Sequence, residues 1–470
     1  MEKQKIIAIV GLNASGKTQY VEKMRRTMAS DSVRYIAFCD TYGAATDRAY
    51  YLQQRWNQHD IDSETPLTGE ALERTFTLTG DDTPQRRQWQ QELYTLFNFH
   101  PLLSKYVITL SSGELRKLQL IKTLLAQPST LILDNPFIGL DEQTRQQLNE
   151  LLPRLSKEKH LTIYLVIARL EDIPAYVDDF IWTTPRQQWQ SASAVGGFPA
   201  NPASVVGGFP ANPASVVGGF PANPASVVGG FPANPASVVG GFPADKSSPA
   251  PNAPEVVRFN NVTIRYGDRT ILNNLDWTIR QGECWALTGP NGSGKSTLLS
   301  LICADNPQAY ACDIRLFGRQ RGSGETIWDI KRRIGYVSPE MHRSYRHNIP
   351  AIQVVASGIR DTVGLYTRVS DADRKQCRKW MQVFGIDDLE QRPFLTLSSG
   401  EQRLALLARA FVKEPELIIL DEPLHGLDTL RCQQVRQIIQ SYSERPATTL
   451  IMVTHYPHEL PPCFNRIKRL

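Results

Sequence analysis

The sequence predicts an α/β fold that occurs twice in the chain, each copy a mostly parallel sheet with helices on both faces. The pattern GxxxxGK[ST], whose glycines let backbone N–H groups surround a phosphate, occurs at residues 11–18 and 289–296. Each pattern follows a short apolar run of strand length, at residues 6–10 and 284–288. A strand, a glycine-rich loop and a helix in this order are typical of α/β folds.

The two halves of the chain also share their internal spacing. The segment Leu-Ser-Ser-Gly-Glu occurs in both, and in each half a later apolar run ends in an aspartate. The separation between Ser111 and Asp134 is identical to that between Ser398 and Asp421. Equal spacing over this length indicates a duplicated fold.

Glycine and proline are concentrated between the two copies. The segment from Ser191 to Pro254 holds more than a third of the chain's 31 Gly and 31 Pro, and the sequence GGFPANPASVV recurs there in tandem. Neither a helix nor a central strand can propagate through such repeats, so we expect a disordered linker that spans roughly 40–50 Å on average. A docking motif of the Pro-x-x-Pro type, as at 199–202, is the alternative. The predicted domains are residues 1–190, the linker 191–254, and residues 255–470.

Composition excludes several classes of protein. A net charge of +5 on 470 residues gives no strong nucleic-acid signal. No apolar run approaches the ~20 residues of a membrane helix, the N-terminus shows no secretory signal, and the seven scattered cysteines form no CxxC pair. A cytoplasmic protein without an integral membrane segment or a cysteine-based metal site is expected.

The two glycine-rich loops predict binding of nucleotide phosphates with Mg²⁺. The loop lysine would reach the β- and γ-phosphates, and the next hydroxyl would ligate Mg²⁺. An aspartate at the end of a neighbouring strand would hold the metal's shell. The predicted phosphate-binding residues are Gly11, Asn13, Gly16, Lys17, Thr18, Gly289, Asn291, Gly292, Gly294, Lys295, Ser296 and Thr297. The predicted metal ligands are Thr18, Asp134, Ser296, Asp421 and Glu340.

With these loops and strands present, Leu-Ser-Ser-Gly-Glu resembles the signature motif of ATP-binding cassette (ABC) ATPases, usually Leu-Ser-Gly-Gly-Gln. Segments 139–141 and 426–428, both Gly-Leu-Asp, resemble the D-loop of that family. The resemblance covers all of the chain except the linker, and it implies a Mg²⁺-dependent ATPase with a helical signature subdomain in each cassette. A simple Ser-Gly helix cap is the alternative interpretation of the signature.

The second cassette matches the family's hydrolytic residues. Glu422 matches the general base that polarises the attacking water, and His455 matches the switch histidine on the γ-phosphate. Tyr266 matches the aromatic residue that stacks on adenine. The resemblance therefore implies that Glu422, His455 and Lys295 are catalytic.

The first cassette departs from the family. Asn135 replaces the general base, and an amide cannot accept a proton at pH 7. Counting the same number of positions from each strand-ending aspartate places Ala168 where the second copy has its switch histidine. The leading strands and an adenine-stacking tyrosine are also missing before Lys17, although a misassigned start codon would produce the same shortage.

The resemblance implies two unequal composite ATP sites, because cassettes of this family pair head to tail. The competent site would join Lys295, Ser296, Asp421, Glu422 and His455 to Ser111 and Gly113. The degenerate site would join Lys17, Thr18 and Asp134 to Ser398 and Gly400. The family's Mg²⁺-bridging Gln is replaced by Glu340 in the second copy and by Asp40 in the first.

The run from Leu316 to Ile330 resembles, more narrowly, a family of double-cassette proteins named for molybdate uptake and for photorepair. Those names imply the energising subunit of a transport system, working with a separate membrane permease at the inner face of the cell membrane. The alternative is a non-transport ABC ATPase with a regulatory, repair or translation-associated role. The uncharged linker counts against the last of these, whose cassettes are joined by charged helical arms.

Deleting three of the tandem repeats should leave most ATPase activity in place, because a tether needs only sufficient length. Lys295→Ala should remove most of it. Phosphate release by the two purified full-length variants measures both effects. A loss of activity in the deletion variant as large as that in Lys295→Ala would contradict a role as a simple spacer.

Overall fold

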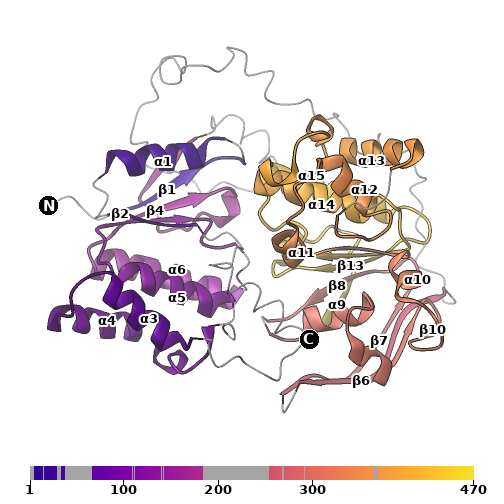
Figure 1. Cartoon of the computed structure of the whole chain (residues 1–470), viewed down its shortest axis with the longest axis horizontal. Coiled ribbons are helices and arrows are strands. Elements are labelled where there is room, and N and C mark those ends of the chain that lie inside the picture. The colour runs from indigo at the N-terminus through magenta and orange to yellow at the C-terminus, as the bar shows by residue number, and fades with distance from the viewer. Residues whose placement is uncertain are drawn as a thin grey trace. The chain divides into compact units, whose positions relative to one another are not determined.

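The computed structural model describes residues 5–13, 15–28, 33–37, 66–107, 110, 112–138, 140, 142–183, 253–266, 269–290, 292–364 and 369–470. The chain divides into two compact units, Met1–Ala211 and Asn212–Leu470 (Figure 1). The tandem repeats lie outside the described residues. The predicted domain boundaries therefore stay a prediction.

The described part of the first unit contains a parallel sheet and two sets of helices. Its strands are β1 (Ile6–Val10), β2 (Val33–Ala37), β3 (Thr130–Asp134), β4 (Thr162–Ile167) and β5 (Asp179–Trp182). Its helices are α1 (Lys17–Thr27), α3 (Thr68–Leu78), α4 (Pro84–Leu96), α5 (Ser112–Leu124) and α6 (Glu142–Glu158). The strand order is β2-β3-β4-β1-β5, and every pair is parallel.

Successive side chains of β1 lie on opposite faces of the sheet, and both faces are buried. Ile9 is buried in a cluster with Val21 of α1, whereas its neighbour Ala8 lies in the cluster that contains Leu118 of α5 and Leu152 of α6. Figure 1 shows α1 on one side of this sheet and α5 and α6 on the other. The two-sided covering explains why these strands are apolar on both faces.

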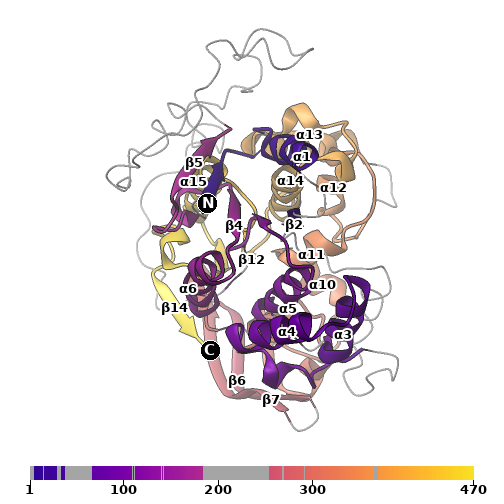
Figure 2. The same ribbon diagram turned by 90° about the vertical axis from the view of Figure 1, so that its left-hand side faces the viewer.

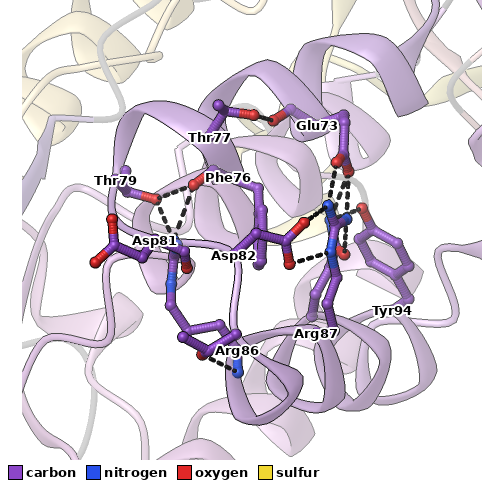
Figure 3. Close-up of polar contacts among 11 residues, drawn as sticks. Glu73, Phe76, Thr77, Thr79, Asp81, Asp82, Arg86, Arg87 and Tyr94 are labelled. Atoms are coloured by element: carbon purple, nitrogen blue, oxygen red, sulfur yellow. Dashed lines mark hydrogen bonds and ion pairs between the residues drawn. The ribbon is translucent and has the colours of Figure 1, made fainter.

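Helices α3, α4 and α5 pack together as a helical subdomain of the first unit (Figure 2). Phe76 of α3 is 1% exposed, and the guanidinium carbons of Arg86 and Arg87 each lie 4.2 Å from its ring centroid (Figure 3). Arg87 also donates hydrogen bonds to Asp82 and Glu73, which lower the pKa of both carboxyls. The cluster fixes the short connection between α3 and α4.

The second unit repeats the parallel sheet and adds an antiparallel one. Its strands are β6 (Glu255–Tyr266), β7 (Arg269–Arg280), β8 (Cys284–Thr288), β9 (Asp313–Leu316), β10 (Arg319–Gln320), β11 (Ile334–Val337), β12 (Leu417–Asp421), β13 (Thr449–Val453) and β14 (Arg466–Arg469). Its helices are α9 (Lys295–Ile302), α10 (Ile327–Lys331), α11 (Pro339–Ser344), α12 (Ala351–Ser357), α13 (Asp371–Val383), α14 (Ser399–Phe411) and α15 (Thr429–Ser443).

The parallel sheets of the two units have the same topology. The order β11-β12-β13-β8-β14 matches that of the first unit strand for strand, so the predicted duplication is confirmed. Leu287 of β8 packs in the cluster with Leu298 of α9, and the adjacent Ala286 lies in the cluster with Leu406 of α14. The antiparallel sheet of the second unit has the strand order β10-β9-β6-β7.

Among the described residues, no helix combines the length and the apolar character needed to cross a bilayer.

Phe76→Ala should destabilise the first unit by about 3–5 kcal/mol, because it removes a buried ring and leaves a cavity beneath two arginines. Leu78→Ala is the matched control on the same helix, since Leu78 is 78% exposed and its truncation should change stability by less than about 0.5 kcal/mol. Scanning calorimetry of the full-length variants measures both. Equal shifts would show that the Phe76 cluster does not hold the subdomain.

Candidate functional site

Each glycine-rich loop ends at a helix N-terminus in a conformation that favours glycine. Gly16 and Gly294 precede α1 and α9 with φ of 85° and 95°, in the left-handed region. Neither provides a side-chain hydrogen bond to the first turn. Both helix N-termini thus present backbone N–H groups and a positive dipole end toward the loop, as an anion site requires.

The loop of the second unit is a narrow cradle. A Cβ atom at Gly289 would lie 2.7 Å from Ser293 Oγ and 2.9 Å from the carbonyl oxygen of Leu470. In the first unit, Thr183 Oγ1 lies 2.8 Å from Ser15 Oγ at the corresponding place beside Gly11. A side chain at either glycine would clash with these neighbours, so each loop requires glycine at its first position.

Both loop lysines lie over their own loops. Lys295 Nζ donates to the carbonyl oxygens of Gly289 at 2.7 Å and Pro290 at 2.8 Å. Lys17 Nζ donates to those of Gly11 at 2.5 Å and Leu12 at 2.6 Å. Phosphate oxygens are stronger acceptors for an ammonium than carbonyl oxygens, so the lysines are positioned to transfer to a bound anion.

In the first unit, the strand-ending Asp134 is hydrogen-bonded through both carboxylate oxygens. Tyr35 donates its hydroxyl to Oδ2 at 2.8 Å, and Asn135 donates its side-chain amide to Oδ1 at 2.9 Å. Burial raises the pKa of Asp134. The sequence analysis did not single out Tyr35, although it lies on β2, the strand that pairs with β3.

In the second unit, Glu422 follows the strand-ending Asp421 and lies between two histidines. His455 Nε2 is 3.1 Å from Glu422 Oε1, and His425 Nδ1 is 3.1 Å from Glu422 Oε2. Burial acts to raise the pKa of Glu422, but hydrogen bonds from His425 and His455 outweigh it and hold that pKa well below its usual range. Burial and the adjacent negative charge of Glu422 raise the pKa of Asp421. Glu422 is therefore the ionised one of the two carboxyl groups, and its carboxylate can accept hydrogen bonds.

The backbone after each aspartate is the same in both units. Asn135 and Glu422 have φ of 53° and 49°, and their N–H groups donate to the carbonyl oxygens of Val166 at 3.0 Å and Val453 at 2.9 Å. Asn tolerates this left-handed conformation, whereas for Glu it costs about 1–2 kcal/mol. The left-handed backbone conformation therefore orients the Glu422 side chain at a cost in conformational energy.

The sheet register is equivalent around His455 in the second unit and Ala168 in the first. Asp421 pairs with Val453 and Asp134 with Val166, so His455 and Ala168 both lie two positions beyond a paired valine. The same counting from each aspartate matches His425 with Ile138. The two histidines that contact Glu422 are thus both replaced by apolar residues in the first unit.

In each unit, one buried arginine connects the signature helix to the turn after the strand-ending aspartate. The sequence analysis did not identify either arginine. Arg403 of α14 donates to the carbonyl oxygens of Ser338 at 2.9 Å and Asp421 at 3.0 Å. Arg116 of α5 donates to that of Pro136 at 2.9 Å. The available signal was an arginine two positions after the signature glutamate in both copies.

The signature of the second unit forms a helix N-cap. Ser398 Oγ accepts from Glu401 N at 3.3 Å, and Glu401 Oε2 accepts from Ser398 N at 2.7 Å. A capping box forms with either Glu or Gln at this position, so it accommodates the Glu of this chain. In the first unit Glu114 pairs with Lys105 at 2.9 Å. Gly400 is buried in the first turn of α14, and Gly113 lies in the first turn of α5.

The other predicted residues lie on the expected elements. Tyr266 is the last residue of β6, and its hydroxyl accepts from Asn306 Nδ2 at 3.0 Å. Glu340 lies in the first turn of α11. Gly292 lies in the loop, and Ser296, Thr297 and Thr18 lie in the first turns of α9 and α1. Asn13 belongs to the first loop. Asp40, Ser111, Gly139, Asp141 and Asn291 lie outside the described residues.

The donor set fits Mg²⁺ held together with substrate phosphates. Hydroxyl and carboxylate oxygens are the ligands this ion prefers, and it usually takes only one or two protein carboxylates with the phosphates and water. The described residues hold no cluster of three or more His, Cys, Asp or Glu side chains arranged around a metal position. Ser296 with Asp421, and Thr18 with Asp134, supply such oxygens.

Comparison with known proteins gives consistent matches. The family model "ABC transporter" matches residues 1–138 and 272–425. The ABC transporter ATP-binding protein ModF of Escherichia coli is 36% identical over 97% of this chain and 89% of its own length. An uncharacterized ABC transporter ATP-binding protein of Schizosaccharomyces pombe is 27% identical over 98% of this chain and 91% of its own.

Two solved structures match the fold of nearly the whole chain. A model of ribosome-bound archaeal Pelota and ABCE1 gives a TM-score of 0.59 at 16% identity, covering 99% of this chain and 72% of that one. A complex of the archaeal ribosomal stalk protein aP1 with the ribosome recycling factor aABCE1 gives 0.53 at 17% identity, covering 99% and 83%. At these identities the likeness concerns the fold alone.

Proposed function

Because the chain belongs to the ABC transporter family and is an ATP-binding ATPase, we propose that it hydrolyses ATP rapidly at only one of its two sites, the one built on the second unit. The observation that carries this proposal is the contrast after the strand-ending aspartate. Glu422 there is ionised and held by two histidines, whereas Asn135 is an amide that donates to Asp134. An amide has no basic lone pair with which to polarise water.

In the competent site, each residue has a distinct role. Lys295 neutralises the β- and γ-phosphates, and Glu422 accepts a hydrogen bond from the attacking water as general base. His455 contacts the γ-phosphate, and Tyr266 stacks on adenine. The position of Lys295 over the loop carbonyls and the ionised state of Glu422 support these roles.

We propose Ser296 and Asp421 as the Mg²⁺ ligands of this site, with Glu340 as a further ligand. When bound, Mg²⁺ would neutralise charge that develops on the phosphates. Thr18 and Asp134 are the proposed ligands of the other site. That site keeps its loop and its lysine, which supports ATP binding without fast turnover.

Following the family's head-to-tail pairing, we propose that the signature of each cassette completes the site of the other. Ser111 and Gly113 would act on the competent site, and Ser398 and Gly400 on the degenerate one. The places of Gly400 and Gly113 in the first turns of α14 and α5 support this proposal, because helix N-termini favour an anion.

For the biological role, we propose that the chain energises transport through a separate permease at the cytoplasmic face of the membrane. The name of the E. coli relative supports transport, and a link to molybdate rests on the resemblance to that relative alone. A non-transport role in regulation, repair or translation is the second candidate, and the ribosomal titles above refer to those other proteins.

Glu422→Gln should lower the turnover number by about 10²–10⁴-fold, because it removes the general base. Asn135→Glu should change turnover little, since the first site also lacks both histidines. Steady-state phosphate release by full-length variants measures both, with the exposed Glu444→Gln as control. Unchanged turnover in Glu422→Gln, or a large gain in Asn135→Glu, would contradict the assignment.

Affinity purification from membrane and soluble fractions should recover a permease with the tagged full-length chain, when Glu422→Gln and ATP are used to slow turnover of the complex. A Lys295→Ala chain, which should not bind ATP tightly, is the control. Co-sedimentation with ribosomes instead of a permease would favour the second candidate role.

A further inference from the structure

His425 occupies a tight turn that starts at the proposed general base. The His425 N–H donates to the carbonyl oxygen of Glu422 at 3.1 Å, and Pro423 lies at the second position of the turn, where proline is favoured. Gly426 follows with φ of 77°. The turn therefore brings the His425 imidazole next to the side chain of Glu422, the first residue of the turn.

The carboxylate of Glu422 is held at both oxygens. His425 contacts Oε2 and His455 contacts Oε1, each at 3.1 Å. The side chains of His425 and His455 are 9% and 7% exposed, and that of Glu422 is 21% exposed. The two rings thus hold the carboxylate from the protein side and leave part of it accessible.

The direction of these hydrogen bonds follows from the chemistry of the groups. A carboxylate that acts as a general base accepts hydrogen bonds, so in that role Glu422 requires a hydrogen on Nδ1 of His425 at the 3.1 Å contact. A neutral imidazole with its hydrogen on Nδ1 satisfies this contact. A constant donor at Oε2 fixes the rotation of the carboxylate about its last bond, which fixes the direction of Oε1.

The first unit supplies an internal comparison. Its turn has the same backbone, with Ile138 N donating to the carbonyl oxygen of Asn135 at 3.3 Å. Where the general base is absent, the histidine is absent as well. A histidine needed only for the turn would have no reason to differ between two turns of the same geometry.

We propose that His425 is a positioning residue for ATP hydrolysis, which holds Oε2 of Glu422 so that Oε1 faces the attacking water after His455 turns to the γ-phosphate. The inference rests on the proposed role of Glu422 as general base. His455 cannot serve both the carboxylate and the γ-phosphate through the same nitrogen, so a second donor is required while ATP is bound.

Three substitutions at His425 separate a hydrogen-bond donor from a packing residue. His425→Ala removes the ring, His425→Leu restores apolar volume without a donor, and His425→Asn keeps an N–H group near the position of Nδ1. Misplacing a reacting group by about 1 Å can cost up to about 10²-fold in rate. We expect Ala and Leu to lower kcat about 10- to 100-fold with nearly unchanged KM for ATP, and Asn to recover most of the loss.

The matched control is His458→Ala, an exposed histidine three positions beyond His455. It should leave kcat and KM near the wild-type values. Thermal unfolding of every full-length variant checks folding. If Ala is unstable, the comparison of Leu with Asn decides the question, because both fill the space and only Asn donates.

A double-mutant cycle supplies a readout that a structural role would not produce. With Glu422→Gln in place, His425→Ala should lower the residual turnover no further, because there is no general base left to orient. Independent, multiplying losses would overturn the inference, and so would equal kcat in Leu, Asn and wild type.

The same experiment separates this inference from the function on which it rests. Unchanged turnover in Glu422→Gln would overturn the assignment of the general base itself. Lost turnover in Glu422→Gln together with wild-type kcat in His425→Leu would overturn only the role of His425.

Discussion

Parallel pairing of β12 with β13, and of β13 with β8, is the constraint on which the candidate site depends. The carboxyl ends of parallel strands meet at one edge of a sheet, so pairing alone brings the phosphate loop after β8 to the same edge as Asp421 and His455. The strands are buried on both faces, which makes their order and register difficult to change. The chemistry can therefore depend on residues that lie far apart in the sequence.

The sequence predicted the features that short local motifs and their spacing encode. The loops, the strands that end in Asp134 and Asp421, and the loss of a base at Asn135 all followed from motifs and their spacing. The partners His425, Tyr35 and Arg403 did not, because the spacing of motifs says nothing of which side chains meet after packing. Tyr35 shows this directly, since its bond to Asp134 joins residues 99 positions apart in neighbouring strands.

Arg403 and Arg116 show how the signature helix and the strand-ending turn behave as one element in each unit. Each arginine is buried and donates to carbonyl oxygens of that turn. A buried guanidinium that loses such acceptors leaves unpaired donors, which are costly. The helix that carries the signature is thus held to the turn that carries Glu422 or Asn135.

The left-handed turn at Asn135 preserves the main chain of a site whose side chains have changed. Its φ and its hydrogen bond to Val166 match those at Glu422 within the scatter of ordinary structures. A backbone conformation that costs little for Asn can persist without the function for which Glu would occupy it. At this turn the two copies therefore agree in their backbone and differ in their side chains, so the conformation alone does not mark a site as able to hydrolyse ATP.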